Sequence, residues 1–217
     1  MQPGASSSLA PWRFDPLACR GELTAFERLL ASSAELGERD DILPFFRAHP
    51  QLAAFLGSYH PNLVTADRLG LEVPLFGMFQ ADAIVGDWTQ HAFCLIEFED
   101  GRAGSVFVRR GRRISDWATR IEHGFSQIVD WLWLLDDQRR TDAFEAFFGA
   151  RHVDLFALLV VGRDRYLTEP ERRRLSWRAR RVLVDSQHVQ CCTFDELAAD
   201  LRARLDTLQV RSGLGHS

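Results

Sequence analysis

FQADAIVGDWTQHAFCLIEFE, residues 79–99, is the stretch of this sequence that decides the fold. It holds two short apolar runs joined by a turn at residues 86–90, with Asp82 in the first run and Glu97 and Glu99 at the end of the second. Strand side chains alternate between faces, so Glu97 and Glu99 point one way and Phe98 points the other. We expect the two runs to pair as a hairpin that brings Asp82 towards both glutamates.

Carboxylates gathered on one half-buried patch repel one another and resist desolvation, so they take up protons, meet a cation or bind a metal. Oxygen-only ligand sets suit hard divalent ions such as Mg²⁺ or Mn²⁺. The sequence therefore predicts a metal site at Asp82, Glu97 and Glu99. Two simpler interpretations stay open. Asp82 caps a turn or pairs with an arginine in the first, and the two glutamates form a solvated strand end beside arginines in the second.

The same residues resemble the core of PD-(D/E)xK nucleases, which has an Asp, a short gap and then an acid-x-Lys on the next strand. Gln80-Ala81-Asp82 and Glu97-Phe98-Glu99 would occupy these places. Glu99 stands where the family usually has lysine, although some restriction enzymes of this superfamily carry glutamate there. The resemblance is a loose motif match, so it serves as a hypothesis.

Composition limits the class of protein. A chain of 217 residues with 46% hydrophobic residues suits one domain with a packed core. It has no apolar run of the length that spans a membrane and no secretory signal at its start, so we expect a cytoplasmic protein with no membrane partner. The four cysteines match no zinc spacing, and we expect reduced, buried thiols.

Charge limits the chemistry further. The net charge of −4 argues against a protein that coats nucleic acid without sequence preference. All 26 basic residues are arginines, a bias that often reflects genome composition. With no lysine in the chain, any cation that stabilises a transition state must come from an arginine, a metal or a partner.

The order of elements predicts an N-terminal helical part followed by a sheet. Residues 1–20 read as a flexible tail and residues 21–66 as the helical part, with Pro44 in a first helical turn and Pro50 kinking or splitting the segment. Residues 67–210 form the expected core. Its first strands are predicted at 69–73, 79–85 and 92–99, with a break at residues 74–77 and a short strand or loop at 104–108.

The second half of the core is predicted to be a long helix over residues 115–136 capped by Ser115, a central strand at 153–161, a basic helix at 168–181 and short strands at 182–184 and 189–192. Thr193 and Glu196 form a capping box for the last helix, and residues 210–217 read as loose. The pattern indicates the α/β class. We expect a restriction-endonuclease-like mixed sheet core flanked by helices, with the helical part at its N-terminus.

From about Gly21 onward, the order of motifs resembles the nuclease domain of Shedu anti-phage defence proteins. A leading helix, the segment from Ile42 through His49-Pro50 to Leu52, the strand acids and a helix bearing Gln127 appear in that order, and the ending TFDEL also fits. Each motif is weak alone. The resemblance implies a metal-dependent DNA endonuclease fold, with the lysine-to-Glu99 difference leaving activity open.

The resemblance also implies roles for individual residues. Asp82 and Glu97 would hold the Mg²⁺ or Mn²⁺ ion, Glu99 would bind a second ion or act as a general base, and Gln127 would position water or phosphate. The DNA backbone would be held by arginines, which match phosphate bidentately: Arg109, Arg110, Arg112, Arg113 and Arg120. Each of these roles has a non-functional alternative. Gln127 is simply exposed, the arginine run is a solvated loop, the basic helix has a solvated face, and the histidines at positions 91, 123 and 152 are structural.

Three function classes remain open from sequence. The first is a DNA endonuclease in prokaryotic defence, and the second is a catalytically inactive nuclease fold that acts as a binding or regulatory module. The third is an enzyme of another kind built on a carboxylate cluster. The chain has no Walker A motif, no HExxH and no G-x-S-x-G. The sequence therefore gives no support for nucleotide hydrolysis, zinc-dependent proteolysis or a serine hydrolase with a nucleophile elbow, respectively. Homo-oligomerisation is left open.

Overall fold

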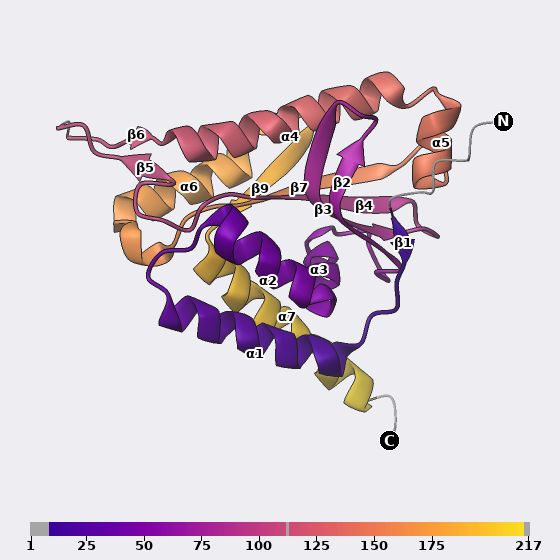
Figure 1. The fold of residues 1–217 in the computed structure, drawn as a ribbon, viewed down its shortest axis with the longest axis horizontal. Coiled ribbons are helices and arrows are strands. Elements are labelled where there is room, and N and C mark those ends of the chain that lie inside the picture. The colour runs from indigo at the N-terminus through magenta and orange to yellow at the C-terminus, as the bar shows by residue number, and fades with distance from the viewer. Residues whose placement is uncertain (1–8, 112, 215–217) are drawn as a thin grey trace.

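A mixed β-sheet forms the centre of the computed structural model, which describes residues 9–111 and 113–214 (Figure 1). Within these residues the sheet has seven strands in the order β1-β2-β3-β4-β7-β9-β8. Strands β1 to β4 are antiparallel neighbours, whereas β4, β7 and β9 run parallel. The bounds are β1 Ala10–Pro11, β2 Arg68–Leu75, β3 Phe79–Asp87, β4 Ala92–Phe98, β7 Asp154–Val160, β8 Leu183–Val184 and β9 Gln187–Cys192.

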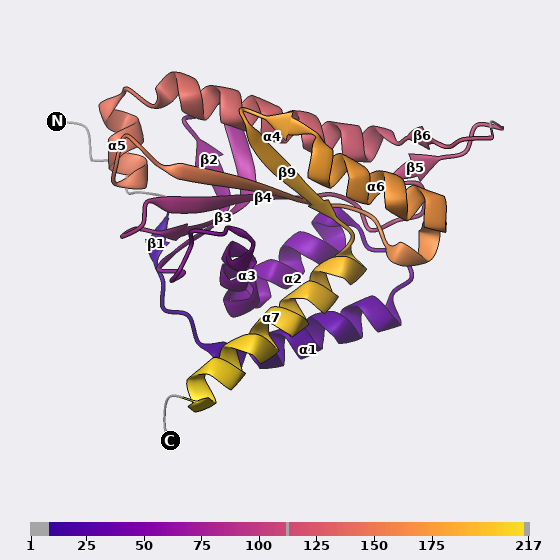
Figure 2. The same cartoon turned by 180° about the vertical axis from the view of Figure 1, so that it is seen from behind.

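Helices cover both faces of this sheet (Figures 1 and 2). One face carries α1 Pro16–Ser32, α2 Leu43–Ala48, α3 Pro50–Phe55 and α7 Phe194–Leu214, and the other carries α4 Thr119–Gln138, α5 Asp142–Phe148 and α6 Glu169–Arg181. Short helical turns are η1 Glu38–Ile42, η2 Leu56–Tyr59 and η3 Asp164–Tyr166, and β5 Phe107–Val108 pairs with β6 Asp116–Trp117. The predicted mixed sheet flanked by helices, with a helical N-terminal part, is confirmed.

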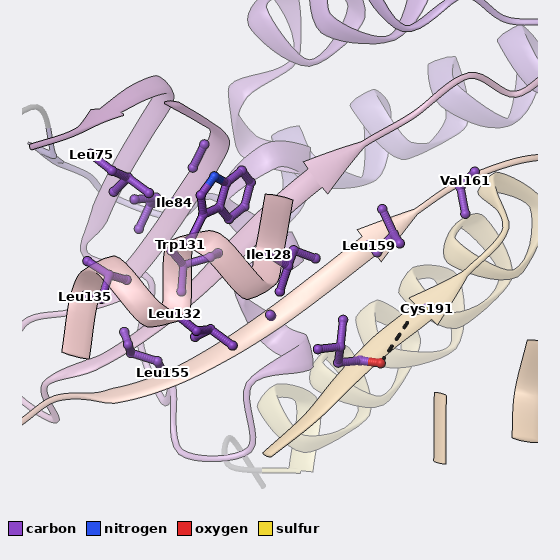
Figure 3. Close-up of a cluster of buried hydrophobic side chains, with 14 of the residues drawn as sticks. Leu75, Ile84, Ile128, Trp131, Leu132, Leu135, Leu155, Leu159, Val161 and Cys191 are labelled. Carbon is purple, nitrogen blue, oxygen red and sulfur yellow. Dashed lines mark hydrogen bonds between the residues drawn. The ribbon is translucent and has the colours of Figure 1, made fainter. Parts of the chain in front are cut away.

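The core consists of one apolar layer on each side of the sheet. Strand β7 lies in the middle, paired with β4 and β9, and its nearly continuous apolar sequence serves both layers. On the α4 side, the apolar stripe of Ile128, Leu132 and Leu135 packs in one cluster with Leu155 and Leu159 of β7 (Figure 3). A fully buried side chain of this size contributes roughly 1.5–3 kcal/mol, so this stripe fixes α4 across the sheet.

The N-terminal helices are tied to the core by a buried arginine. Arg163 follows β7, is 4% exposed, and forms a bidentate pair with Asp195 at the start of α7. Its remaining donors bind the carbonyl oxygens of Leu30 and Ser33 at the end of α1. One guanidinium therefore joins three elements that are distant in sequence.

The first helix begins earlier than the sequence predicted. Residues 1–20 were expected to be irregular, but α1 starts at Pro16, because Asp15 accepts from the first backbone N–H groups and proline suits the first helical turn. Ala10 also pairs with Leu69 at the sheet edge. Residues 1–8 of the expected tail lie outside the described residues. Pro50 splits the second helical segment into α2 and α3, as predicted.

Two sequence-based boundaries in the core are wrong. The break expected at residues 74–77 does not interrupt β2, which continues to Leu75. Proline is tolerated there because, within the described residues, β1 pairs with Arg68 and Leu69 and no strand covers the outer edge of β2 at Pro74. Ser115 is not a helix cap either, since residues 116–117 form β6 and the Ser115 hydroxyl donates to Glu171.

The remaining differences lie in helices. Helix α5 had no predicted counterpart, and α7 is helical to Leu214, whereas residues 210–217 were expected to be loose and 215–217 lie outside the described residues. The capping box of Thr193 and Glu196 is present. All four cysteines are buried and free, as predicted. In the described part of the chain no helix is long and apolar enough to cross a membrane.

Candidate active site

Asp82 and Glu97 lie on adjacent antiparallel strands. The register pairs Ala83 with Ile96, so its continuation sets Asp82 opposite Glu97. The backbone N–H of Phe98 donates to Oδ2 of Asp82 at 2.7 Å, which holds the aspartate across the strand pair. Glu97 is 4% exposed, and its Oε2 is buried without a hydrogen-bond partner among the described residues. The hairpin predicted from sequence therefore brings these two carboxylates together.

The side chains of β2 and β3 switch faces of the sheet next to Asp82, and this switch places Asp82. On β3, Ala81 packs in the core on the α4 side, whereas Ala83 packs in the opposite core, although residues two apart on a regular strand share a face. Val73 and Leu71 of β2 differ in the same way, and Glu72 between them has a φ of 50°. Such a distortion re-aims a side chain. Asp82 thus lies where the strands pass from one core to the other.

Glu99 faces α4 and already has two partners. It is 1% exposed, its Oε1 lies 2.8 Å from Nδ1 of His123, and its Oε2 accepts from Nη1 of Arg120 at 3.3 Å. Burial raises the pKa of Glu99, while the contact with His123 opposes the rise. No group of three or more acidic, histidine or cysteine side chains forms a ready metal cage within the described residues. The pair Asp82 and Glu97 is accordingly the candidate ligand set, with Glu99 beside it.

Gly124 permits this close approach of Glu99 to α4. A Cβ at position 124 would lie 2.6 Å from Leu159 Cδ1 and 3.0 Å from Glu99 Cγ. We expect Gly124→Ala to reduce the free energy of unfolding by about 1–3 kcal/mol, because overpacking a filled core forces side chains to shift. Urea unfolding would measure the change. Equal or greater stability than the parent would show that the site has room for the methyl group.

The second wall of the site comes from the N-terminal helical part. The backbone N–H of Glu38, the first residue of η1, donates to Asp100 Oδ1 at 3.0 Å. Arg120 joins this wall to the sheet, since its Nε lies 3.2 Å from Asp100 Oδ2 and its Nη1 lies 3.7 Å from Glu38 Oε2. Arg120 thus pairs with three acids from two segments, Glu38 of η1 and the consecutive Glu99 and Asp100 after β4, and these contacts hold it in the pocket.

The walls enclose a cavity of about 650 Å³ with an acidic lining. Burial raises the pKa of Asp82 and of Glu97. Repulsion from neighbouring carboxylates, first Asp82 and then Glu99 and Glu38, raises the pKa of Glu97 further. Burial also raises the pKa of Glu38, against the attraction of Arg120. The acids that line the cavity are Glu38, Asp40, Glu72, Asp82, Glu97 and Asp100. A site of this kind favours bound protons or a bound cation.

Gln127 lines the same cavity as Arg120 and His123. The three residues are spaced by three and four on α4, which puts them on one face of the helix. The side-chain oxygen of Gln127 is buried and has no hydrogen-bond partner in the described chain. Arg120, Gly124 and Gln127 share one face of α4, as their spacing of four and three residues in the sequence predicts. The unpaired oxygen of Gln127 can accept from a hydrogen-bond donor or bind a cation.

The predicted DNA-binding residues Arg109, Arg110 and Arg113 do not line the cavity. Arg109, Arg110 and Arg113 are exposed on the connection between β5 and β6, which projects from the end of the molecule (Figure 1). Arg109 lies 3.6 Å from Glu171, while its side chain remains 65% exposed. Arg112 lies outside the described residues. Whether this run contacts DNA stays a prediction.

The arginine run has a direct test in salt dependence. Each phosphate contact releases counterions, so DNA affinity falls with salt with a slope of about −0.9 per contact on duplex DNA. Replacing Arg109, Arg110, Arg112 and Arg113 with serine is expected to flatten that slope. Affinity for a short duplex would be measured from 50 to 200 mM salt. An unchanged slope would assign the run to a solvated loop.

Sequence reasoning did not find Glu38, Asp100 and His123 as site residues. His123 was given a structural role, yet it lies three residues from Arg120 and four from Gln127, so helical spacing already signalled it. Asp100 follows Glu99 directly. Glu38 had no comparable signal, because its approach depends on how the N-terminal helices fold over the sheet.

The fold and cavity together define an α/β protein with an acidic pocket, built on a strand hairpin and closed by α4 and the N-terminal helices. Residues 36–198 match the family model described as Shedu protein SduA, C-terminal. This match covers well over half of the chain, and the chain belongs to that family. No curated protein matches it.

Proposed function

We propose that this protein is a metal-dependent DNA endonuclease of prokaryotic anti-phage defence. Membership of the Shedu family suggests the defence role. The observation that carries the chemistry is the facing pair of Asp82 and Glu97 in an acidic cavity, with one glutamate oxygen buried and unpaired. A buried carboxylate oxygen without a partner, next to a second carboxylate, is costly and calls for a proton or a cation.

The donor set fits a hard divalent ion. Mg²⁺ and Mn²⁺ prefer oxygen ligands, and Mg²⁺ is commonly held by one or two carboxylates together with water and substrate phosphate. Asp82 and Glu97 would supply the carboxylates, with the backbone carbonyl near Phe98 as a further oxygen. When bound, such an ion polarises a phosphate oxygen and lowers the pKa of a coordinated water.

Arg120 takes the part that lysine has in the usual nuclease motif. The chain contains no lysine, and Glu99 occupies the lysine position of the motif. The Arg120 guanidinium lies 3.3 Å from Glu99, so a fixed positive charge from α4 stands beside that position. Glu99 and Asp100 orient the guanidinium, which then stabilises the charge that develops on the phosphate.

The remaining side chains have supporting roles. Glu99 holds His123 and Arg120 on the inner face of α4 and is the candidate proton acceptor for the attacking water. Gln127 lines the cavity and donates through its amide nitrogen to water or phosphate, while its side-chain oxygen is buried and unpaired among the described residues. Glu38 and Asp100 complete the negative lining around Arg120.

The test is cleavage of linear and circular DNA by the purified protein with Mn²⁺ and with EDTA. Cleavage in Mn²⁺ only, lost in Asp82→Asn, is the expected result. Asp82→Asn keeps the side-chain shape while it removes a ligand charge. A folded protein that binds DNA but cleaves none under either condition would favour the second function, a catalytically inactive nuclease fold that acts as a binding or regulatory module.

A further inference from the structure

Helix α6 presents an unbalanced positive face outside the acidic pocket. Its sequence carries six arginines, but two of them are already committed. Arg174 stacks on the rings of Phe107 and Trp117 and donates to Ser115, and Arg178 pairs with Glu122 of α4. These contacts fix α6 against α4 and the β5–β6 pair.

On the solvent-exposed side of α6, the arginines have no such contacts among the described residues. Arg173, Arg180 and Arg181 are exposed, and no carboxylate of the described residues forms an ion pair with any of them. Between them lies Trp177, whose side chain is 64% exposed. Positions 173, 177, 180 and 181 are spaced by three and four, so they form one face of the helix. Arginines one turn before and after the indole thus border an exposed aromatic ring.

A groove beside this face gives it depth. It has a volume of about 870 Å³ and lies between Trp177 and Arg173 on α6 and Arg113 and Ile114 on the chain leading to β6. Ile114 is 66% exposed, so both sides of the groove offer apolar surface next to guanidinium groups. The carboxylate in this groove is Glu171, which already accepts from Ser115 and Thr168.

This combination fits one kind of partner. Guanidinium groups match phosphate oxygens bidentately, and an exposed aromatic ring provides a stacking platform for an unpaired base. Eight residues of helix span about 12 Å, the reach of a few nucleotides of one strand. A duplex would offer the phosphates but no free base face to Trp177. We propose that the α6 face formed by Arg173, Trp177, Arg180 and Arg181 binds single-stranded nucleic acid.

The surface also stands in a useful place relative to the pocket. Glu122 of α4 pairs with Arg178 of α6, and the next residue, His123, contacts Glu99 in the acidic cavity. The packed side of α6 and the cavity therefore lie on either side of the first turns of α4, and α6 lies beside that part of α4 in Figure 2. The proposed face is turned to solvent on α6 itself. The idea that this surface guides an unpaired strand to the pocket rests on the proposed nuclease function. Binding of a strand to the surface does not require cleavage.

The experiment measures binding of fluorescein-labelled dT20 and rU20 by anisotropy in EDTA, where metal-dependent cleavage does not occur. Trp177→Ala is expected to weaken binding of the DNA strand about tenfold or more, because loss of a base-stacking ring has an effect of this size. Trp177→Phe should retain most of the affinity. The triple variant Arg173→Ser, Arg180→Ser, Arg181→Ser should reduce the salt slope of log affinity by about two to three. The rU20 arm reports whether the surface distinguishes RNA from DNA.

Trp133→Ala is the matched control. Trp133 is 57% exposed on α4, nearly as exposed as Trp177, but its helical neighbours at three and four residues include Asp130, Asp136 and Asp137. Its removal should leave strand affinity unchanged. Equal losses in both tryptophan variants, or none in either, would overturn the proposal. So would a duplex that binds as tightly as dT20 with the same response to Trp177→Ala, or a poly-glutamate peptide that competes fully with dT20 at equal charge.

Failure of this proposal is distinct from failure of the nuclease function. If the pocket does not cleave, dT20 binding in EDTA and its loss in Trp177→Ala still stand. If the α6 face does not bind strands, Mn²⁺-dependent cleavage by the pocket is still observable. Circular dichroism of each variant confirms that the fold is intact, and the salt slope of the triple arginine variant keeps the test valid if the alanine variant unfolds.

Discussion

Glu97→Gln is expected to abolish metal-dependent cleavage and the thermal stabilisation that millimolar Mn²⁺ gives the parent protein. The substitution keeps the shape of the side chain but removes one ligand charge from the pair with Asp82. Ligand linkage raises the melting temperature only if the folded protein binds the ion. Melting curves of both proteins with Mn²⁺ and with EDTA measure this effect, and a DNA cleavage assay measures the activity.

The same substitution should have the opposite effect on the metal-free protein. Glu97 is buried and repelled by Asp82, Glu99 and Glu38, so relief of this crowding should leave Glu97→Gln as stable as the parent or more stable by about 0–2 kcal/mol. Glu145→Gln is a control. Glu145 lies on α5 in a half-exposed ion pair with Arg151, and the substitution removes the same charge there. A parent that gains nothing from Mn²⁺ and is destabilised by Glu97→Gln would make Glu97 a structural ion-pair partner.

The pH dependence of this difference has a definite sign. Burial, followed by repulsion from Asp82, raises the pKa of Glu97 above its unfolded value. A raised carboxyl pKa gives stability that is fully present below the unfolded pKa of about 4.3 and is lost as the pH rises through the folded pKa. The glutamine does not titrate. The stability advantage of Glu97→Gln in EDTA should therefore grow between pH 5 and pH 8 in urea unfolding, and a constant difference would contradict it.

Arg120→Ala is expected to lower the cleavage rate by about 10²–10³-fold, the usual effect of removing a group that stabilises transition-state charge. Metal affinity should not fall, because removing a cation from an acidic pocket does not weaken attraction for a divalent ion. Arg120→Lys should recover part of the rate, since it restores the charge without the two-nitrogen contact to Glu99 and Asp100. Cleavage is measured at saturating Mn²⁺.

Arg102→Ala provides the control for this experiment. Arg102 lines the same cavity and its side chain is 47% exposed, compared with 50% for Arg120. Among the carboxylates of the described residues, its guanidinium pairs with Asp100 alone, at 3.9 Å. Its removal should change the rate by less than about tenfold. Added methylguanidine at millimolar concentration should raise the rate of Arg120→Ala and leave Arg102→Ala unaffected. Equal rates for the two alanine variants would mean that Arg120 only organises the acids around it.

Local pattern was enough to predict the parts of the site that depend on alternation or helical spacing. The hairpin followed from two apolar runs and a short turn, and it set Asp82 beside Glu97. The shared face of Arg120, Gly124 and Gln127 followed from spacing on one helix. The lysine-free composition already restricted the pocket cation to arginine, metal or a partner.

The parts that failed depend on contacts between distant segments. Ser115 is a residue type that caps helices, but residues 116–117 after it pair with residues 107–108 as strands instead of starting a helix. The switch of faces at Asp82 depends on Glu72 adopting a positive φ, which no side-chain pattern announces. Glu38 reaches the pocket only after the N-terminal helices pack on the sheet. Tertiary structure overrides local preference in each of these cases.

The Arg163 junction has a consequence for cooperativity. Because one permanently charged guanidinium binds the end of α1 and the start of α7 from a position at the end of β7, these elements are joined at a single buried point. Opening α1 alone would break the two hydrogen bonds from this charged donor to the carbonyl oxygens of Leu30 and Ser33, each worth about 1.5–3 kcal/mol. The N-terminal helices and the central strand therefore form one cooperative folding unit, and the wall that carries Glu38 belongs to the same unit as the strands that carry Asp82 and Glu97.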